Sequence, residues 1–239
     1  MNGMQLTRLK SLINYALIIL IVLIGIVTVL LCSRNERALK KGNRLLENGD
    51  FIGARNVYER IIARNPENFS AHYGLGMSWC AETIYKTELH LAEPEDWYPA
   101  IYHMTIAMNM KEHRQVQETL AILHFNLGAC FKKRNDYATA IKLFEQAVAY
   151  NPGLLKALNM LGALYHERKN FSKAEYYYKQ AIAVQPDYAM AHFNLGALAW
   201  ARQDYQKAAE SFRKAAELEP DNSYFQNWLI KAQEHAGNH

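Results

Sequence analysis

The sequence predicts an all-α protein in which helix–turn–helix units stack into a solenoid. Gly128, Gly162 and Gly196 lie 34 residues apart, and the hexapeptide His124–Ala129 recurs letter for letter as residues 192–197. Four more series share this spacing: Ala140, Ala174 and Ala208; Phe144, Tyr178 and Phe212; Ala147, Ala181 and Ala215; Pro152, Pro186 and Pro220. A period of 34 residues is typical of repeats that contain two antiparallel helices.

Within one period, two helical stretches are joined by a short polar turn. Leu154–Arg168 and Ser172–Val184 are the expected helices, and Pro186 ends the second one because proline lacks a backbone N–H donor. Small residues stand where the helices approach each other and large ones fill the space between them: Gly162, Ala174 and Ala181, then Leu161, Tyr165 and Tyr178. A single helix pair cannot bury its apolar face, so the units must stack.

The succession of a Leu-Gly pair, an aromatic residue, alanine, a second aromatic residue, alanine and proline resembles the tetratricopeptide repeat (TPR) family. The resemblance implies a right-handed superhelix whose concave face is lined mainly by the first helix of each repeat. It also implies that peptides or helices of other proteins bind on that face. We expect five repeats, over residues 35–68, 69–114, 121–154, 155–188 and 189–222.

The flanking repeats depart from the pattern. The first repeat has Lys41 where the pattern has leucine, as suits a terminal unit. The second is longer, because Gly76 and Gly128 are 52 residues apart. We therefore expect an insertion over residues 80–99, by default a solvated loop, and a helix extension over residues 115–120. Residues 223–239 are expected to form a capping helix and tail, with four side chains turned inward: Tyr224, Phe225, Trp228 and Leu229.

One N-terminal transmembrane helix is expected ahead of the repeats. Leu12–Leu31 is twenty residues long, carries no charge, and as a helix would span about 30 Å, the thickness of a hydrocarbon core. It follows a tail of residues 1–11 and precedes a basic flank of residues 32–34. A cleaved signal peptide is the alternative, but its apolar region is normally about 7–15 residues long. We therefore expect an uncleaved, single-pass anchor.

The charge distribution bears on the orientation of this anchor. Residues 1–50 contain seven Lys/Arg and three Asp/Glu, a net charge of +4, and the remaining 189 residues are neutral. Two basic residues precede the span and five follow it within twenty residues, which favours a cytoplasmic repeat domain. A short basic tail before a single span also occurs in exported proteins, so a periplasmic or other extracytoplasmic location stays open. Cys32, Cys80 and Cys130 lack paired spacing, which suits a reducing compartment.

The sequence carries no motif that predicts catalysis, a metal site or a cofactor site. His72, His124 and His192 share one packing position in three repeats, so we expect them to be structural. No zinc-type or haem-type Cys/His spacing and no glycine-rich phosphate loop occurs. The repeats have no clustered basic residues, which argues against a nucleic-acid partner. A small-molecule substrate is not expected either.

The resemblance implies that recognition takes place on the concave face. The residues expected there are Tyr73, Met77, Phe125, Asn126, Lys156, Asn159, His166, Phe193, Asn194 and Trp200. Asn126 and Asn194 match a position at which some TPR proteins bond the backbone of a bound peptide. An amide both donates and accepts hydrogen bonds, which suits a peptide main chain. The alternative is that these asparagines cap or bridge neighbouring helices.

Two further comparisons refine the expected partner. TPR domains that clamp a C-terminal carboxylate use lysine, asparagine and arginine at set places, and here only Asn43 matches in the first three repeats. The groove is therefore expected to be apolar and aromatic. In the expected insertion, Trp97 and Tyr98 are a possible second interface, since long loops in compact arrays are often functional.

We hypothesise a membrane-anchored TPR scaffold that binds membrane-associated proteins or peptides and assists assembly or stability of a membrane complex. One alternative is a permanent accessory subunit whose Leu12–Leu31 helix packs against transmembrane helices of its partners. Another is an enzyme or cofactor-handling protein that uses His166 and its neighbours. The sequence favours the scaffold, because it provides a repeated groove and no catalytic motif.

Overall fold

The structure, a computed structural model, describes residues 34–88 and 92–237, which are helical in all their regular segments. Residues 34–47 form the first helix described. The helices that follow are α2 (Phe51–Ile62), α3 (Phe69–Glu88), α4 (Pro94–Met110), α5 (Arg114–Lys133), α6 (Tyr137–Tyr150), α7 (Leu155–Glu167), α8 (Phe171–Val184), α9 (Ala189–Ala201), α10 (Tyr205–Leu218) and α11 (Ser223–Ala236).

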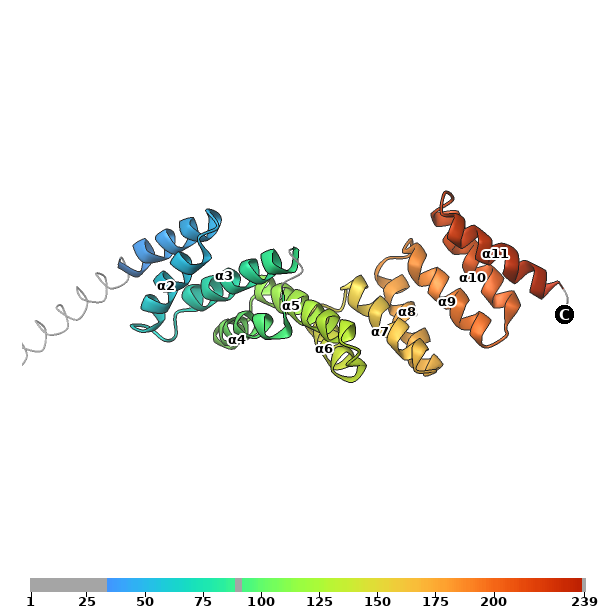
Figure 1. Ribbon diagram of the computed structural model, residues 1–239, viewed down its shortest axis with the longest axis horizontal. Coiled ribbons are helices and arrows are strands. Elements are labelled where there is room, and N and C mark those ends of the chain that lie inside the picture. Colours follow the sequence, from blue (N-terminus) through green and yellow to red (C-terminus); the bar gives the residue numbers. More distant parts are fainter. Residues whose placement is uncertain (1–33, 89–91, 238–239) are drawn as a thin grey trace, which may run out of the picture.

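Consecutive helices pair into hairpins that stack along one long axis (Figure 1). The first helices of the five pairs are residues 34–47, α3, α5, α7 and α9, and each packs on the second helix that follows it. Each second helix also contacts the next first helix, so the hairpins form a continuous array. The all-α TPR solenoid predicted from the 34-residue period is confirmed.

The turn inside each regular hairpin has one local design. Asp50, Asp136, Asn170 and Asp204 cap the second helices by accepting a hydrogen bond, at 2.8 to 3.2 Å, from the backbone N–H three residues later. The residue before each cap has a positive φ: Gly49, Asn135, Lys169 and Gln203. Such a residue reverses the chain after the first helix, and the side-chain oxygen then satisfies an otherwise unpaired N–H.

Glycine on the first helix lets the ring from the second helix approach. A Cβ placed on Gly162 would lie 2.3 Å from Cε1 of Tyr178, and one on Gly196 would lie 2.6 Å from Cδ1 of Phe212. The Tyr178 and Phe212 rings are almost completely buried. The contact between glycine and ring therefore sets how closely the two helices of a repeat pack.

The second repeat differs from what we expected for its insertion. A loop over residues 80–99 is wrong: α3 continues to Glu88 and α4 already begins at Pro94. Proline fits the first turn of a helix, where its missing N–H leaves no partner unsatisfied. Glu93 and Asp96 form a capping box there, with the Glu93 N–H donating to Asp96 Oδ2 at 2.9 Å.

The surplus residues of this repeat therefore lengthen helices. α3 and α5 each have 20 residues, whereas α7 and α9 have 13. Residues 115–120 do not extend the preceding helix, because α4 ends at Met110 and α5 begins at Arg114. The expected second-helix spacing is confirmed, since Ala100, Met104 and Ala107 are completely buried.

At the C-terminal end, α11 covers the last hairpin. Phe225 is buried and Trp228 and Leu229 pack against the same cluster, as expected for a cap. Tyr224 was expected to turn inward, but its side chain is 57% exposed. It lies at the second position of α11 on the rim, where one edge of its ring reaches Phe193, at 5.1 Å between ring centroids.

The predicted transmembrane helix Leu12–Leu31 lies outside the described residues. Within residues 34–88 and 92–237, no helix combines the length and the apolar character needed to cross a bilayer.

Candidate protein-binding face

The first helices share a face that their second helices do not cover, which we call the inner face. Its N-terminal part contains a cavity of about 380 Å³ between residues 34–47 and α3. Two of the expected binding residues, Tyr73 and Met77, line it. The complete lining is Leu39, Asn43, Leu46, Glu47, Tyr58, Phe69, Ser70, Tyr73, Gly74 and Met77. This N-terminal cavity joins neighbouring repeats.

Tyr58 of α2 forms the floor of the N-terminal cavity. Its ring packs against Gly42 and Gly74, where a Cβ would come within 2.7 and 2.5 Å of ring atoms. The Tyr58 hydroxyl donates to Asn43 Oδ1 at 2.8 Å. Burial, and then the charge of Glu47, raise the pKa of Tyr58 to about 12, so the phenol stays neutral. An apolar wall with a fixed polar floor suits an amphipathic side chain of a partner.

A second cavity, of about 480 Å³, lies between α7 and α9, and we call it the C-terminal cavity. It brings together His166 and Asn194, which were both expected on this face. Its lining is Ala163, His166, Glu167, Lys169, Phe171, Tyr178, Asn194 and Ala201. Burial lowers the pKa of His166, and its ring meets Phe171 edge-on at 5.7 Å between centroids. The imidazole therefore presents neutral donor and acceptor nitrogens at neutral pH.

Asn194 bridges two first helices, because its amide donates to Asn159 Oδ1 at 2.6 Å. The bridging alternative raised from the sequence is thus realised for this residue. One N–H and the carbonyl oxygen of Asn194, and the NH₂ group of Asn159, are not used by that bond. The pair can therefore hold the two helices together and still offer polar groups to a peptide main chain.

The middle of the inner face is formed by α5 and the start of α7. Phe125 and Asn126 are half-buried, and the Phe125 ring lies 5.4 Å from that of Phe144. Lys156 is exposed. The sequence analysis missed Ile122 and Met190, which are 47% and 39% exposed and occupy the same repeat position as Lys156. The 34-residue register was the signal for them, and it adds apolar surface to this face.

Two expected binding residues are covered by the cap. Phe193 is only 6% exposed, and its ring stacks on Phe225 at 5.0 Å. Trp200 packs edge-on against Trp228 at 5.4 Å and His235 at 4.9 Å. Helix α11 takes the place that the first helix of a sixth repeat would have. Phe193 therefore does not lie open to a partner, and Trp200 is only half-exposed.

The pair Trp97 and Tyr98, expected in a loop, divides between core and surface. Trp97 is 1% exposed in the cluster with Met104 and Leu120, and its indole N–H has no hydrogen-bond partner among the described residues. Tyr98 is 48% exposed, and Tyr102 follows it at 62% on the same face of α4. Only the tyrosines can therefore serve as surface contacts. Their spacing of four residues was the helical signal.

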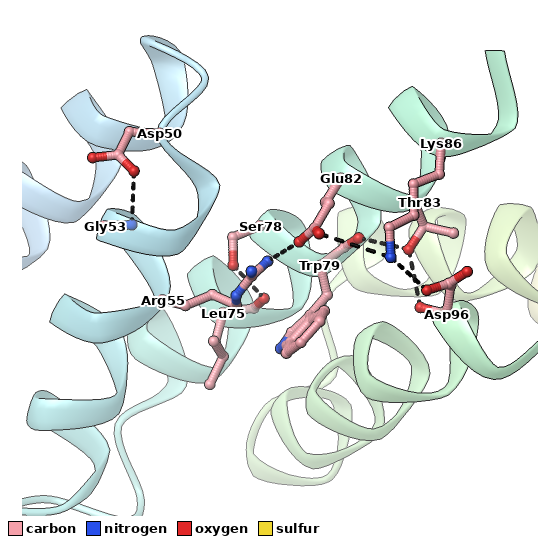
Figure 2. A network of polar contacts seen from close by, with 10 residues as sticks. All are labelled: Asp50, Gly53, Arg55, Leu75, Ser78, Trp79, Glu82, Thr83, Lys86 and Asp96. Atoms are coloured by element: carbon pink, nitrogen blue, oxygen red, sulfur yellow. Dashed lines mark hydrogen bonds and ion pairs between the residues drawn. The ribbon is translucent and has the colours of Figure 1, made fainter. Parts of the chain in front are cut away.

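A chain of polar contacts fixes the first repeat to the long second one (Figure 2). Arg55 of α2 pairs with Glu82 of α3, and its guanidinium lies 4.0 Å over the Trp79 ring. Lys86, one turn after Glu82, pairs with Asp96 of α4 at 2.6 Å. The hydrogen bond to Asp96 raises the pKa of Lys86, while the Glu93 N–H and then Lys86 lower that of Asp96. These contacts hold the walls of the N-terminal cavity in place.

The repeated histidines are structural, as expected, at the two sites that are buried. His72 and His124 are 5% and 7% exposed, and each bonds a backbone carbonyl, of Pro66 and of Leu120. His72 also meets His103 of α4, with their Nδ1 atoms 3.1 Å apart. Among the residues that the structure describes, no three His, Cys, Asp or Glu side chains come together as a metal site would require.

Comparison with protein families agrees with this architecture. Two models described as tetratricopeptide repeat match the chain, one over residues 118–187 and the other over residues 39–81, 170–223 and 193–239. Together they match more than half of the chain. No curated protein matches the sequence.

Solved structures of similar fold include three that align over most of the chain. MamA protein is 22% identical, with a TM-score of 0.50, over 80% of this chain and 94% of its own. YrrB, described as a TPR protein with an unusual peptide-binding site, is 18% identical, with a TM-score of 0.50, over 82% and 90%. The C-terminal part of a TPR protein from Cytophaga hutchinsonii is 17% identical, with a TM-score of 0.52, over 84% and 72%. At these identities the likeness concerns the fold.

Proposed function

Because this chain belongs to the tetratricopeptide repeat family, a family of protein-interaction scaffolds, we propose that it is a membrane-anchored adaptor that captures protein segments on its inner face. The adaptor recognises its partners and carries out no reaction itself. It assists the assembly or stability of a membrane complex by holding one component at the bilayer. The repeat domain lies on the cytoplasmic side.

The observation that carries the proposal is the pair of cavities on the inner face. Each is formed by first helices of two neighbouring repeats, with apolar walls and a tyrosine, Tyr58 or Tyr178, on its floor. Between them lie Phe125 and Asn126, half-buried, and the exposed Ile122. Two pockets on one face, connected by a strip with apolar and amide groups, fit an extended or helical segment with two apolar anchors.

The tether is argued from the sequence. Leu12–Leu31 is uncharged, and only Cys32 and Ser33 separate it from the helix of residues 34–47. Such a short connection would keep the inner face close to the bilayer. Confinement raises the effective concentration of the adaptor for partners in the same membrane without any added contact.

The proposal is tested by crosslinking the full chain to its partners in native membranes and identifying them by mass spectrometry. Tyr73→Ala and Asn126→Ala change the inner face and should weaken capture of the same partners several-fold. Tyr176→Ala is the matched control, because this tyrosine of α8 is 57% exposed and does not line either cavity. Circular dichroism should show equal helicity for all variants.

Equal capture by the inner-face variants and the control would contradict binding on this face. The amount of partner that co-purifies in detergent separates two roles. Partners present well below one per chain support an assembly adaptor. A partner present at one per chain supports a permanent subunit of the complex. Recovery of the chain in the soluble fraction without detergent would contradict the membrane tether.

A further inference from the structure

The exposed face of the first described helix carries a row of basic residues. Along residues 34–47 the basic side chains are Arg34, Arg37, Lys40, Lys41 and Arg44, and all five are exposed. The spacing of Arg34, Arg37, Lys41 and Arg44, at three, four and three residues, places them on one side of an α-helix. We call these five residues the basic stripe.

The opposite side of the same helix is held by the repeat array. Gly42 is buried against the Tyr58 ring, and Leu45 and Leu46 pack against the cluster of Ala54, Tyr58 and Leu75. The helix therefore cannot turn its basic side inward. Its orientation is fixed by packing, and the basic stripe faces outward.

The basic stripe is not neutralised by the protein. Among the described residues, Arg34, Lys41 and Arg44 form no ion pair with an acidic side chain. Elsewhere exposed basic residues find acidic neighbours, as Lys179 and Arg202 do at Glu175. A row of unneutralised positive charge on a fixed helix is suited to an external anionic surface.

We propose that the basic stripe docks on anionic phospholipid headgroups and sets the orientation of the repeat array on the membrane. This inference rests on the proposed tether, since Leu31 is the last residue of the expected span and Arg34 follows three residues later. A basic cluster directly beside a span lies within the field of an anionic leaflet, where each Lys or Arg adds about fivefold to binding. The field decays over about 10 Å, so the stripe must contact the surface.

Docking in this way leaves the N-terminal cavity accessible. Asn43 and Glu47, which line the cavity, follow Lys40 and Arg44 by three residues each and so lie at about 60° from them around the helix, away from Arg34. The lipid-facing side and the cavity side are therefore different faces of one helix. The stripe would hold the inner face beside the bilayer surface without covering it.

The test measures the surface accessibility of Lys40 in the full chain. The protein is placed in nanodiscs of phosphatidylcholine alone, or with about one third phosphatidylserine, and lysine acylation is followed by mass spectrometry. We expect acylation of Lys40 to slow several-fold in the anionic discs, with Lys214 of α10 unchanged as the internal reference. About 0.5 M salt should remove the protection, because it shortens the screening length to a few ångströms.

A charge-matched pair of variants makes the test specific. The triple variant Arg34→Gln, Lys41→Gln and Arg44→Gln keeps Lys40 as the reporter and should lose its protection. The control triple variant Lys142→Gln, Arg168→Gln and Arg213→Gln removes the same charge from exposed residues elsewhere and should keep it.

Each other outcome overturns a defined statement. Equal acylation of Lys40 in neutral and anionic discs, with the chain inserted in both, overturns the lipid contact and leaves the tether intact. Failure of the chain to co-purify with discs of either composition overturns the tether and the lipid contact together. Protection of Lys40 by added RNA in neutral discs, without protection by phosphatidylserine, overturns the assignment of the stripe to lipid.

Discussion

Replacing Gly162 by alanine tests whether the contact between glycine and ring sets the helix spacing. The new Cβ would lie 2.3 Å from Cε1 and 2.6 Å from Cδ1 of Tyr178. The Tyr178 ring is 1% exposed, so it has no free space into which it can move. The matched control is Gly76→Ala, whose Cβ would meet the flexible end of Met104 at 3.1 Å.

Two opposing terms decide the sign for each variant. Alanine in place of glycine inside a helix stabilises by about 1 kcal/mol. Overpacking a filled core costs about 1–3 kcal/mol, and the 2.3 Å approach to a rigid ring belongs at the upper end. We therefore expect Gly162→Ala to lower the free energy of unfolding by about 1–2 kcal/mol. Gly76→Ala should change it by less than about 1 kcal/mol, because Met104 can adjust.

The assay should resolve individual repeats, since long arrays do not always unfold in a single step. Native-state hydrogen exchange of the full chain in detergent gives the opening free energy of α7 and α8 separately from that of α3 and α4. Gly162→Ala should reduce protection in α7 and α8. Unchanged protection there, or a larger loss for Gly76→Ala in α3 and α4, would refute the reasoning.

Two further predictions concern pH and the cap. Burial, and then His72, lower the pKa of His103 to about 4, whereas an unfolded histidine titrates near 6.5. The unfolded chain therefore binds more protons between these values, so stability should be constant above pH 7 and fall from pH 6.5 to 4. Denaturant midpoints across this range should fall less steeply for His103→Asn; an equal slope would exclude His103 as the source. Phe225→Ala should destabilise α10 and α11 by about 3–5 kcal/mol in hydrogen exchange, whereas Tyr224→Ala, at an exposed ring, should not.

The regular part of the fold could be predicted because each repeat restates the same local rules. Gly128, Gly162 and Gly196 mark close contacts that the structure contains, and Pro152 and Pro186 lie just beyond the ends of second helices. The second repeat has no such redundancy. There the prolines indicated a loop, although Pro94 is equally compatible with the first turn of a helix.

The candidate site was predictable by position and not by coverage. The register placed Tyr73, Met77, His166 and Asn194 on first helices, and the structure brings them to two cavities. Whether a residue at such a position stays open depends on the next helix in the array. For Phe193 that helix is α11, whose packing depends on contacts between residues far apart in sequence. The link from Arg55 through Glu82 to Asp96 has the same long-range origin.

The joints on either side of α7–α8 are alike. Both begin with a turn in which the residue before the first helix donates its N–H to the carbonyl three residues earlier, Leu154 to Asn151 and Tyr188 to Gln185. Because each unit contacts mainly its neighbours, identical joints make the unit interchangeable. The array can therefore grow or shorten by whole copies of residues 155–188, which changes the reach of the protein from the membrane while the long second repeat and the cap keep their own contacts.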